Sequence, residues 1–173
     1  MTLSIVPSRS GADGAGAPAP SFGVVICAYS PARWTELVRA VESVAGQSRP
    51  AAQITVVIDH NDVLLARARR AFPYAHVAAS DGVPGLSGAR NTGLRHVDAD
   101  VVAFLDDDAS ADPGWLDAMV RHFQDPQVIG LGGWVVPRWE SAATGWLAPE
   151  LYWIVGCSYR GLPAGVAEIR NPI

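Results

Sequence analysis

Lysine is missing from this chain of 173 residues, and its thirteen basic side chains are all arginine. The missing amine argues against enzymes that use a lysine to hold a phosphorylated aspartate. Cysteine is scarce. Cys27 and Cys157 are far apart and have apolar neighbours in the sequence, which favours buried small side chains over a disulfide or a metal pair. None of the four histidines has metal-ligand spacing with either cysteine.

Long apolar runs are missing too, because none approaches the roughly 18 residues that cross a membrane. Residues 1–20 are rich in Gly, Ala, Pro and Ser, without a charged segment followed by an apolar one. They are therefore predicted to be a disordered leader rather than a signal peptide. We expect a cytoplasmic location, with peripheral association with the inner face of a membrane left open. The net charge of −4 argues against a nucleic-acid partner.

What is present is a globular composition with alternating strand and helix patterns. Continuous apolar runs, typical of strands buried on both faces, alternate with segments whose apolar residues recur at helical spacing. Strands are predicted at 22–29, 53–59, 75–80, 100–105 and 128–136. Helices are predicted at 30–47, 61–72, 86–97 and 112–124, with Ser87 and Asp112 expected to cap the last two.

This alternation predicts an α/β fold with a mostly parallel sheet and helices on both faces. In such sheets ligands bind beyond the carboxyl ends of the strands, near a point where the strand order reverses. Polar clusters follow three predicted strands, at 28–30, 59–62 and 106–108. We expect these clusters to meet at one edge of the sheet and to form the binding site.

The densest cluster is "FLDDDAS", with three adjacent carboxylates at Asp106, Asp107 and Asp108. Adjacent like charges repel, whereas a hard divalent cation with a diphosphate would neutralise them together. The alternative is a solvated turn that caps the next helix, but Asp112 is expected to supply that cap. Two further side chains fit either a ligand contact or a purely structural role. Asp59 fits a contact to a base N–H or a turn, and Arg90 fits a phosphate contact or a structural role.

Four segments, in order, are "VVICAYSPARWTELVRAVESVAGQ", "ITVVIDHND", "GLSGARNTGL" and "VVAFLDDDA". Together they resemble the family 2 glycosyltransferases of the GT-A fold, a Rossmann-like sheet flanked by helices. The resemblance covers residues 22–136 and implies a nucleotide-sugar donor domain, usually for a UDP-sugar, with Mn²⁺ or Mg²⁺. It implies an inverting transfer to an acceptor (saccharide, lipid or protein) that the sequence does not identify. Residues 137–173 would begin a truncated acceptor-side region.

The resemblance also implies roles for individual residues. The nucleoside would lie against Ala28, Tyr29 and Ser30, and its base would contact Asp59. Arg90 would lie near the diphosphate. The three aspartates match the Asp-x-Asp motif, with Asp106 or Asp107 on the ribose and Asp108 on the metal. Gly133 and Trp134 would lie near the sugar and the acceptor.

The chain departs from the family pattern in two places. Its second predicted strand ends in "DHND" instead of the common Asp-Asp-Gly-Ser, which weakens the assignment of Asp59. A carboxylate that serves as general base is also expected downstream, and neither Glu150 nor Glu168 has a matching context. The alternative is therefore a catalytically incomplete fragment that binds nucleotide-sugars.

The motif "FLDDDAS" also fits the haloacid-dehalogenase phosphatases, with Asp106 as the nucleophile and Asp108 as the acid. That motif normally follows the first strand, whereas three strand–helix units precede it here. These phosphatases also use a lysine, which this chain lacks. A dinucleotide-binding dehydrogenase is disfavoured because no Gly-x-Gly-x-x-Gly turn follows the first predicted strand.

Overall fold

A computed structural model describes residues 3–4, 18–139 and 146–161 of the chain. The chain divides into two compact units, Met1–Gly132 and Gly133–Ile173. The boundary expected from the sequence, after residue 136, lies inside the second unit. In the parts of the chain that the structure describes, no helix has the length and apolar character needed to cross a membrane.

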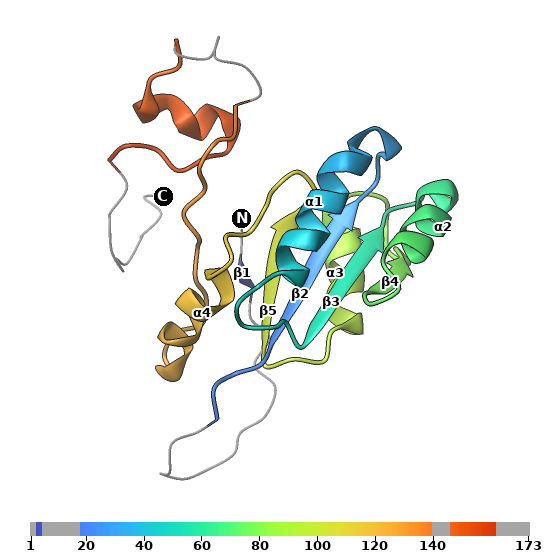
Figure 1. Ribbon diagram of the computed structural model, residues 1–173, viewed down its shortest axis with the longest axis horizontal. Coiled ribbons are helices and arrows are strands. Elements are labelled where there is room, and N and C mark those ends of the chain that lie inside the picture. The colour runs from blue at the N-terminus through green and yellow to red at the C-terminus, as the bar shows by residue number, and fades with distance from the viewer. Residues whose placement is uncertain (1–2, 5–17, 140–145, 162–173) are drawn as a thin grey trace. The chain divides into compact units, whose positions relative to one another are not determined.

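The first unit is built on a five-stranded sheet in the order β1-β5-β2-β3-β4 (Figure 1). Strands β2, β3, β4 and β5 run parallel, and β1 pairs antiparallel with β5. The chain moves outward from β2 to β4 and then returns to the other side of β2, so the strand order reverses between β2 and β5. The bounds are β1 Leu3–Ser4, β2 Phe22–Ala28, β3 Gln53–Ile58, β4 His76–Ala79 and β5 Val101–Asp106.

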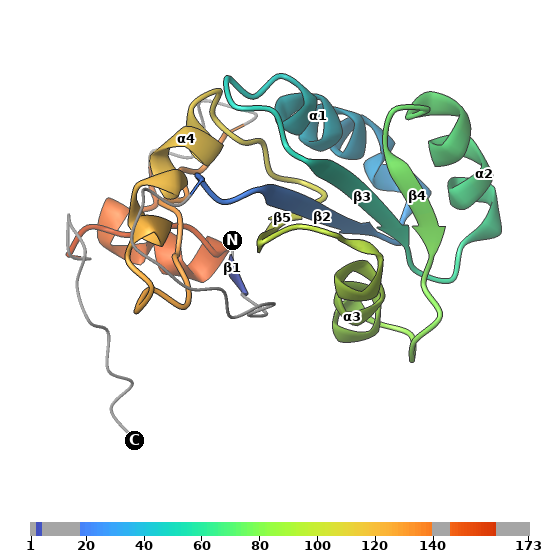
Figure 2. The same ribbon diagram turned by 90° about the horizontal axis from the view of Figure 1, so that it is seen from below.

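Helices cover both faces of this sheet, as Figure 2 shows. On one face, α1 (Trp34–Ala45), α2 (Asp62–Ala71) and α4 (Trp115–Val120) contribute to one large apolar cluster. On the other face, α3 (Leu86–His96) packs against β2 and β3 over a smaller cluster. Because β2 is buried on both faces, its sequence is apolar at successive positions rather than at alternate ones. The predicted α/β fold with a mostly parallel sheet is confirmed.

Helix α3 approaches the sheet closely because Gly93 faces β2. A Cβ added at Gly93 would lie 2.4 Å from a methyl carbon of Val25. Gly88 is equally constrained, since a Cβ there would lie 1.9 Å from the carbonyl oxygen of Val83. Both glycines therefore serve packing, one against the sheet and the other against the preceding loop.

Helix α4 is fastened to the end of α1 by the buried side chain of Gln47. Its Nε2 donates to the carbonyls of Ser43 and Asp112, at 3.0 and 2.6 Å. Its Oε1 accepts from the N–H of Leu116 at 3.1 Å. A single buried amide thus satisfies backbone groups on both sides of the contact.

Several predicted details are wrong. The segment 128–136 is not a strand: Ile129 and Val136 are 82% and 71% exposed, and the glycines between them favour an irregular backbone. The fourth helix begins at Trp115, not after Asp112, because the Asp112 carbonyl accepts the Trp115 N–H in a preceding turn.

Two further predictions, one about a helix cap and one about the leader, are also wrong. Ser87 is not a cap, since α3 begins one residue earlier and its N-cap is Gly85 at φ 121°. Leu3–Ser4 belong to the predicted disordered leader but form β1, whose backbone completes the edge beside β5. The remainder of the predicted leader before residue 18 lies outside the described residues.

In the second unit, the described chain contains a 3₁₀ helix, η4 (Pro149–Val155). Two hydrogen bonds of 2.9 Å join Val135 and Ser158: the Ser158 N–H donates to the Val135 carbonyl, and the Val135 N–H donates to the Ser158 hydroxyl oxygen. Arg160 pairs with Glu150 at 2.9 Å. Glu168 lies outside the described residues.

Candidate functional site

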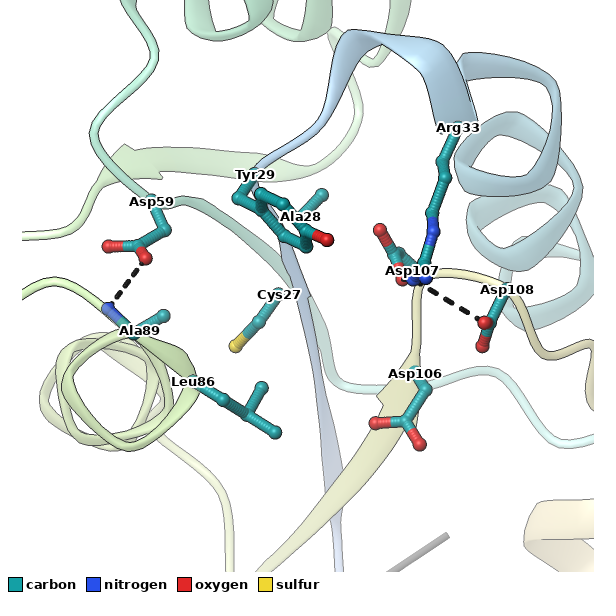
Figure 3. A pocket seen from close by; sticks show the side chains of 11 residues that line it. Cys27, Ala28, Tyr29, Arg33, Asp59, Leu86, Ala89, Asp106, Asp107 and Asp108 are labelled. Atoms are coloured by element: carbon teal, nitrogen blue, oxygen red, sulfur yellow. Dashed lines mark hydrogen bonds and ion pairs between the residues drawn. The ribbon is translucent and has the colours of Figure 1, made fainter. Parts of the chain in front are cut away.

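A pocket of about 400 Å³ opens where β2, β3 and β5 end, beside the start of α3 (Figure 3). Since these three strands are neighbours in the sheet, the polar clusters that follow them meet, as the sequence predicts. The pocket lies at the side of β2 where the strand order reverses, the usual ligand position in such sheets. It is lined by Cys27, Ala28, Tyr29, Arg33, Asp59, Gly85, Leu86, Ala89, Asp106, Asp107 and Asp108.

Asp107 is the buried member of the acidic cluster, with 5% of its surface exposed. Its Oδ1 accepts from Nη1 of Arg33 at 3.1 Å, whereas its Oδ2 is buried without a hydrogen-bond partner among the described residues. Burial raises the pKa of Asp107, the Arg33 charge opposes this rise, and the flanking Asp108 and Asp106 charges add to it. Asp107, which lines the pocket, therefore carries a buried acceptor oxygen that nothing in the described chain satisfies.

Arg33 comes from η1 (Pro31–Arg33), the turn between β2 and α1. Its Nη1 also lies 3.4 Å from Oδ2 of Asp108, so one guanidinium pairs with two neighbouring carboxylates (Figure 3). The charge of Asp107, followed by its hydrogen bond, raises the pKa of Arg33 above its ordinary value. The turn is held in place by Ser30, whose hydroxyl accepts the Ala32 N–H at 3.3 Å.

Asp106 has a separate basic partner on the other face of the sheet. Arg90, from α3, donates from Nη2 to Oδ1 of Asp106 at 3.0 Å and lies 5.4 Å from the ring centre of Phe104. The aromatic ring and the carboxylate together fix the guanidinium. Each of the two arginines thus neutralises a different part of the acidic cluster.

Asp59 closes the opposite side of the pocket, directly after β3. Its Oδ2 accepts the Gly85 N–H at 2.8 Å, and its Oδ1 lies 2.7 Å from Nδ1 of His60. Burial would raise the pKa of Asp59, but the hydrogen bonds from His60 and Gly85 outweigh it and lower the pKa. Asp59 is therefore an ionised acceptor at neutral pH, and it also fixes the start of α3.

Cys27 lies between these groups, and its chemistry is restrained by its surroundings. Burial, the largest effect, raises the pKa of the Cys27 thiol to about 12. At neutral pH the sulfur is therefore protonated, and a protonated thiol is neither a good nucleophile nor a metal ligand. The chemistry available to this pocket is that of carboxylates, guanidinium groups and backbone N–H groups.

Comparison with known proteins identifies the family of the chain. Residues 23–161 match the family described as Glycosyl transferase family 2. The chain belongs to this family. The match spans most of the sequence and excludes the phosphatase interpretation, while the observed sheet agrees with the GT-A fold expected of the family.

Individual relatives of this family 2 chain cover different parts of it. A glucosyl-dolichyl phosphate glucuronosyltransferase of Haloferax volcanii is 34% identical over 152 residues, which are 86% of this chain and 49% of that protein. A pre-mycofactocin glycosyltransferase of Mycobacterium tuberculosis is 44% identical over 61 residues, covering 35% of this chain and 12% of that protein. The chain thus spans about half the length of the Haloferax relative and less of the mycobacterial one.

Among solved structures, residues 1–349 of TarS from S. aureus give a TM-score of 0.49 at 21% identity. That comparison covers 68% of this chain and 38% of that chain. The same TarS segment in complex with UDP-GlcNAc gives a TM-score of 0.48 at 22% identity, over 68% of this chain and 37% of that one.

The predicted site residues of this family 2 chain fall into three groups. Six line the pocket: Ala28, Tyr29, Asp59, Asp106, Asp107 and Asp108. Two are not among the lining residues: Ser30 caps η1, and Arg90 pairs with Asp106. Gly133 and Trp134 begin the second unit, and their relation to the sugar and acceptor stays a prediction.

Sequence reasoning missed several lining residues, and Arg33 is the most informative of them. It is the only basic residue in "AYSPARW", between a strand end and a helix, and this position could have signalled a role at the sheet edge. Gly85 was also missed. Its place in "DGVPG" suggested only a loop, although its N–H holds Asp59. No sequence signal distinguishes the apolar lining residues, such as Leu86, from core residues.

The donor atoms of the pocket suit a hard cation without forming a ready-made cage. Among the described residues, no group of three or more His, Cys, Asp or Glu side chains is arranged around a common metal position. Four aspartates and the two arginines, Arg33 and Arg90, leave two net negative charges when all are ionised. Carboxylate oxygens completed by phosphate oxygens and water are the usual surroundings of Mg²⁺, so the residues fit such a group.

Proposed function

We propose that this chain carries the donor-binding part of a glycosyltransferase that transfers a sugar from a nucleotide-diphosphate sugar, specifically a UDP-sugar. The observation that carries the proposal is the pocket. It gathers an arginine and four carboxylates, one of which carries an unsatisfied buried oxygen, at the ends of three neighbouring parallel strands. Family membership supports the reaction class, and the Haloferax relative is named as a glucuronosyltransferase.

The base and ribose would occupy the part of the pocket between Asp59 and Asp106. A carboxylate has about four lone-pair sites, so Asp59 can accept a base N–H in addition to its bonds with Gly85 and His60. Ribose hydroxyls would donate to Asp106, whose Oδ1 already accepts from Arg90. Tyr29, which is largely exposed at the pocket rim, would cover the nucleoside.

The diphosphate would be bound with Mn²⁺ or Mg²⁺ at the acidic cluster. Asp108 is the carboxylate that would hold the cation, because its side chain is the most accessible of the three, at 54% exposure. When bound, the cation would act as a Lewis acid that stabilises negative charge on the departing nucleoside diphosphate. The buried Oδ2 of Asp107 would receive a hydrogen-bond donor or cation that it lacks in the described chain.

The transfer step requires more than this pocket. An inverting transfer needs a base that removes the proton of the acceptor hydroxyl. Glu150 is paired with Arg160 at 2.9 Å, and Glu168 lies outside the described residues. We therefore assign the chain's residues to donor binding and leave the base and the acceptor unassigned.

The first prediction tests donor binding by thermal unfolding of the 173-residue chain. UDP together with Mn²⁺ should raise the melting temperature, since a ligand at 100 times its Kd stabilises a fold by about 2.7 kcal/mol. UDP alone or Mn²⁺ alone should give a much smaller rise. Asp108→Asn should lose the metal-dependent part, because the neutral amide is a weaker cation ligand.

The matched control is Asp125→Asn, which removes an exposed carboxylate outside the pocket. It should keep the full rise. An equal rise in wild type and Asp108→Asn would contradict the metal assignment, and no rise in any chain would contradict donor binding. Assays with UDP-sugars would then separate transfer from binding alone, the alternative that the sequence left open.

A further inference from the structure

Arg33 contacts the same carboxylate that the proposed function gives to the divalent cation. Its Nη1 lies 3.1 Å from Asp107 and 3.4 Å from Asp108. In Figure 3 its side chain descends from the turn above β2 and ends between the two carboxylates. Before any ligand binds, the positive charge at this position is therefore supplied by the protein itself.

The two contacts of Arg33 differ in how easily they can be broken. Asp107 is buried, and without the guanidinium it would be an uncompensated charge inside the protein, which is strongly unfavourable. Asp108 is more than half exposed and can exchange Arg33 for water or another cation. Arg33 is thus anchored by Asp107 and lies only loosely against Asp108.

A second observation indicates that the arrangement is poised for a ligand. Asp107 lines the pocket, and its Oδ2 atom is buried and has no hydrogen-bond partner in the described chain. A buried carboxylate oxygen without a partner costs free energy, and an incoming donor or cation would recover it. The ion pair with Arg33 uses Oδ1 of Asp107 and leaves Oδ2 without a hydrogen bond.

We propose that Arg33 is a built-in counter-cation that competes with the divalent metal for Asp108 and is drawn away by the diphosphate of the nucleotide. The proposal rests on the proposed function. A guanidinium binds phosphate through paired N–H groups, so the diphosphate offers Arg33 a better partner than Asp108. Arg33 would keep its bond to Asp107 while it turns, and Asp108 would become free for the metal.

The consequence is a coupling between the nucleotide and the metal. Metal alone should bind weakly because it must displace Arg33, whereas UDP should strengthen metal binding. By linkage, the metal must strengthen UDP binding by the same factor. Removing Arg33 should therefore tighten the binding of metal alone and reduce this coupling.

The test uses Mn²⁺ as the probe, with the signal of free Mn²⁺ in electron paramagnetic resonance reporting binding to the full chain. Arg33→Gln should bind Mn²⁺ alone about tenfold more tightly than wild type, the scale on which one nearby charge changes the affinity of a carboxylate for a proton. Adding UDP should strengthen Mn²⁺ binding strongly in wild type and only slightly in the variant. The melting temperature shows whether each chain is folded.

In the Arg33→Gln chain the buried charge of Asp107 is uncompensated and can destabilise the fold. A double variant keeps the proposal testable in that case. Arg33→Gln with Asp107→Asn makes the buried pair neutral, so any gain in Mn²⁺ affinity comes from the release of Asp108. Arg67→Gln is the matched control: that guanidinium lies 3.9 Å over the ring of Trp34, outside the pocket, and its loss should leave Mn²⁺ binding unchanged.

Two failures can be told apart. Unchanged or weaker binding of Mn²⁺ alone in both Arg33 variants would overturn the competition, even if UDP binds wild type normally. Lack of UDP binding by every chain would instead overturn the proposed function, and with it the displacement of Arg33 by a diphosphate. A tenfold gain restricted to the two Arg33 variants, with reduced UDP coupling, is the supporting result.

Discussion

At the scale of single residues, the three aspartates after β5 have different surroundings although they are adjacent. The side chains of Asp106 and Asp108 are 45% and 54% exposed, while that of Asp107 is 7% exposed. This difference arises because successive residues at a strand end point to different sides, and because Arg33 meets the middle one. The carboxylates of the outer two are therefore much more accessible to bulk solvent than that of Asp107.

Asp59 should be the residue through which the pocket distinguishes UDP from a ribose diphosphate that lacks the base. Asp59→Asn should weaken UDP binding about tenfold or more in the presence of Mn²⁺, because an ionised acceptor becomes an amide that can present an N–H instead. The same substitution should change the affinity for ribose 5-diphosphate, which has no base, only slightly. Isothermal titration calorimetry with both ligands measures the difference.

The control for this measurement is Asp62→Asn, an exposed carboxylate in the first turn of α2 and outside the pocket. It should bind both ligands as wild type does. Equal losses for UDP and ribose 5-diphosphate in Asp59→Asn would show that Asp59 acts only through the loop that it holds at Gly85, and would contradict a base contact.

Sequence reasoning could identify the acidic cluster and Asp59 because each follows a recognisable apolar strand. It could not identify the pairing of Arg33 with Asp107, since those residues are 74 positions apart and meet only when β2 and β5 lie side by side. Nor could it determine which of three identical side chains is buried. These properties depend on the register of the sheet and on the turn that carries Arg33.

At the scale of elements, β2 and β5 are joined at their starts by a compact polar link. Oδ2 of Asp100 accepts from the N–H and the hydroxyl of Ser21, at 2.9 and 2.7 Å. The Asp100 N–H donates back to the Ser21 hydroxyl oxygen at 3.0 Å. This link holds together the two strands whose opposite ends form the pocket.

The pH dependence of stability should reveal this link. Hydrogen bonds from the Ser21 hydroxyl and N–H lower the pKa of Asp100, against a smaller effect of burial. A lowered folded-state pKa stabilises the fold above the unfolded-state pKa, and this contribution disappears as the pH falls through the folded value. Asp100→Asn should therefore cost roughly 1 kcal/mol or less at pH 7, and nearly nothing in strong acid.

Urea unfolding of wild type and Asp100→Asn across the acidic range measures this difference. Asp98→Asn is a suitable control, because that exposed side chain has no hydrogen bond among the described residues. A stability difference that stays constant from neutral to acidic pH would contradict the assignment of the effect to the ionised carboxylate.

The elements that sequence patterns predicted well are those with buried apolar faces. Strands such as β2 and β5 are nearly continuous apolar runs, and α1 buries residues at helical spacing. The segment 128–136 has a similar composition but no neighbouring strand in the described chain, and composition alone cannot supply one. Likewise, the Asp112 carbonyl accepts from Trp115 and from Gln47, which is 65 positions away, and a capping rule does not foresee this second contact.

At the scale of the whole chain, the pocket and the apolar core belong to the same unit. All eleven lining residues precede Gly132. The buried residues of both apolar clusters lie between Phe22 and Val120. The two apolar clusters and the pocket proposed for the donor thus both lie within the first unit, whereas Gly133 and Trp134 begin the second.

A chain that ends at Gly132 should therefore fold and bind UDP with Mn²⁺ as the longer chain does. Because no lining or core-cluster residue is removed, its UDP affinity should stay within a factor of about two, which is about 0.4 kcal/mol. Its thermal unfolding should remain a single cooperative transition, as expected for a domain with an intact core. Calorimetric titration and differential scanning calorimetry of the two chains make the comparison. Loss of UDP binding with cooperative unfolding retained would mean that residues after Gly132 complete the donor site, and it would assign the segment around Trp134 to the donor rather than to the acceptor.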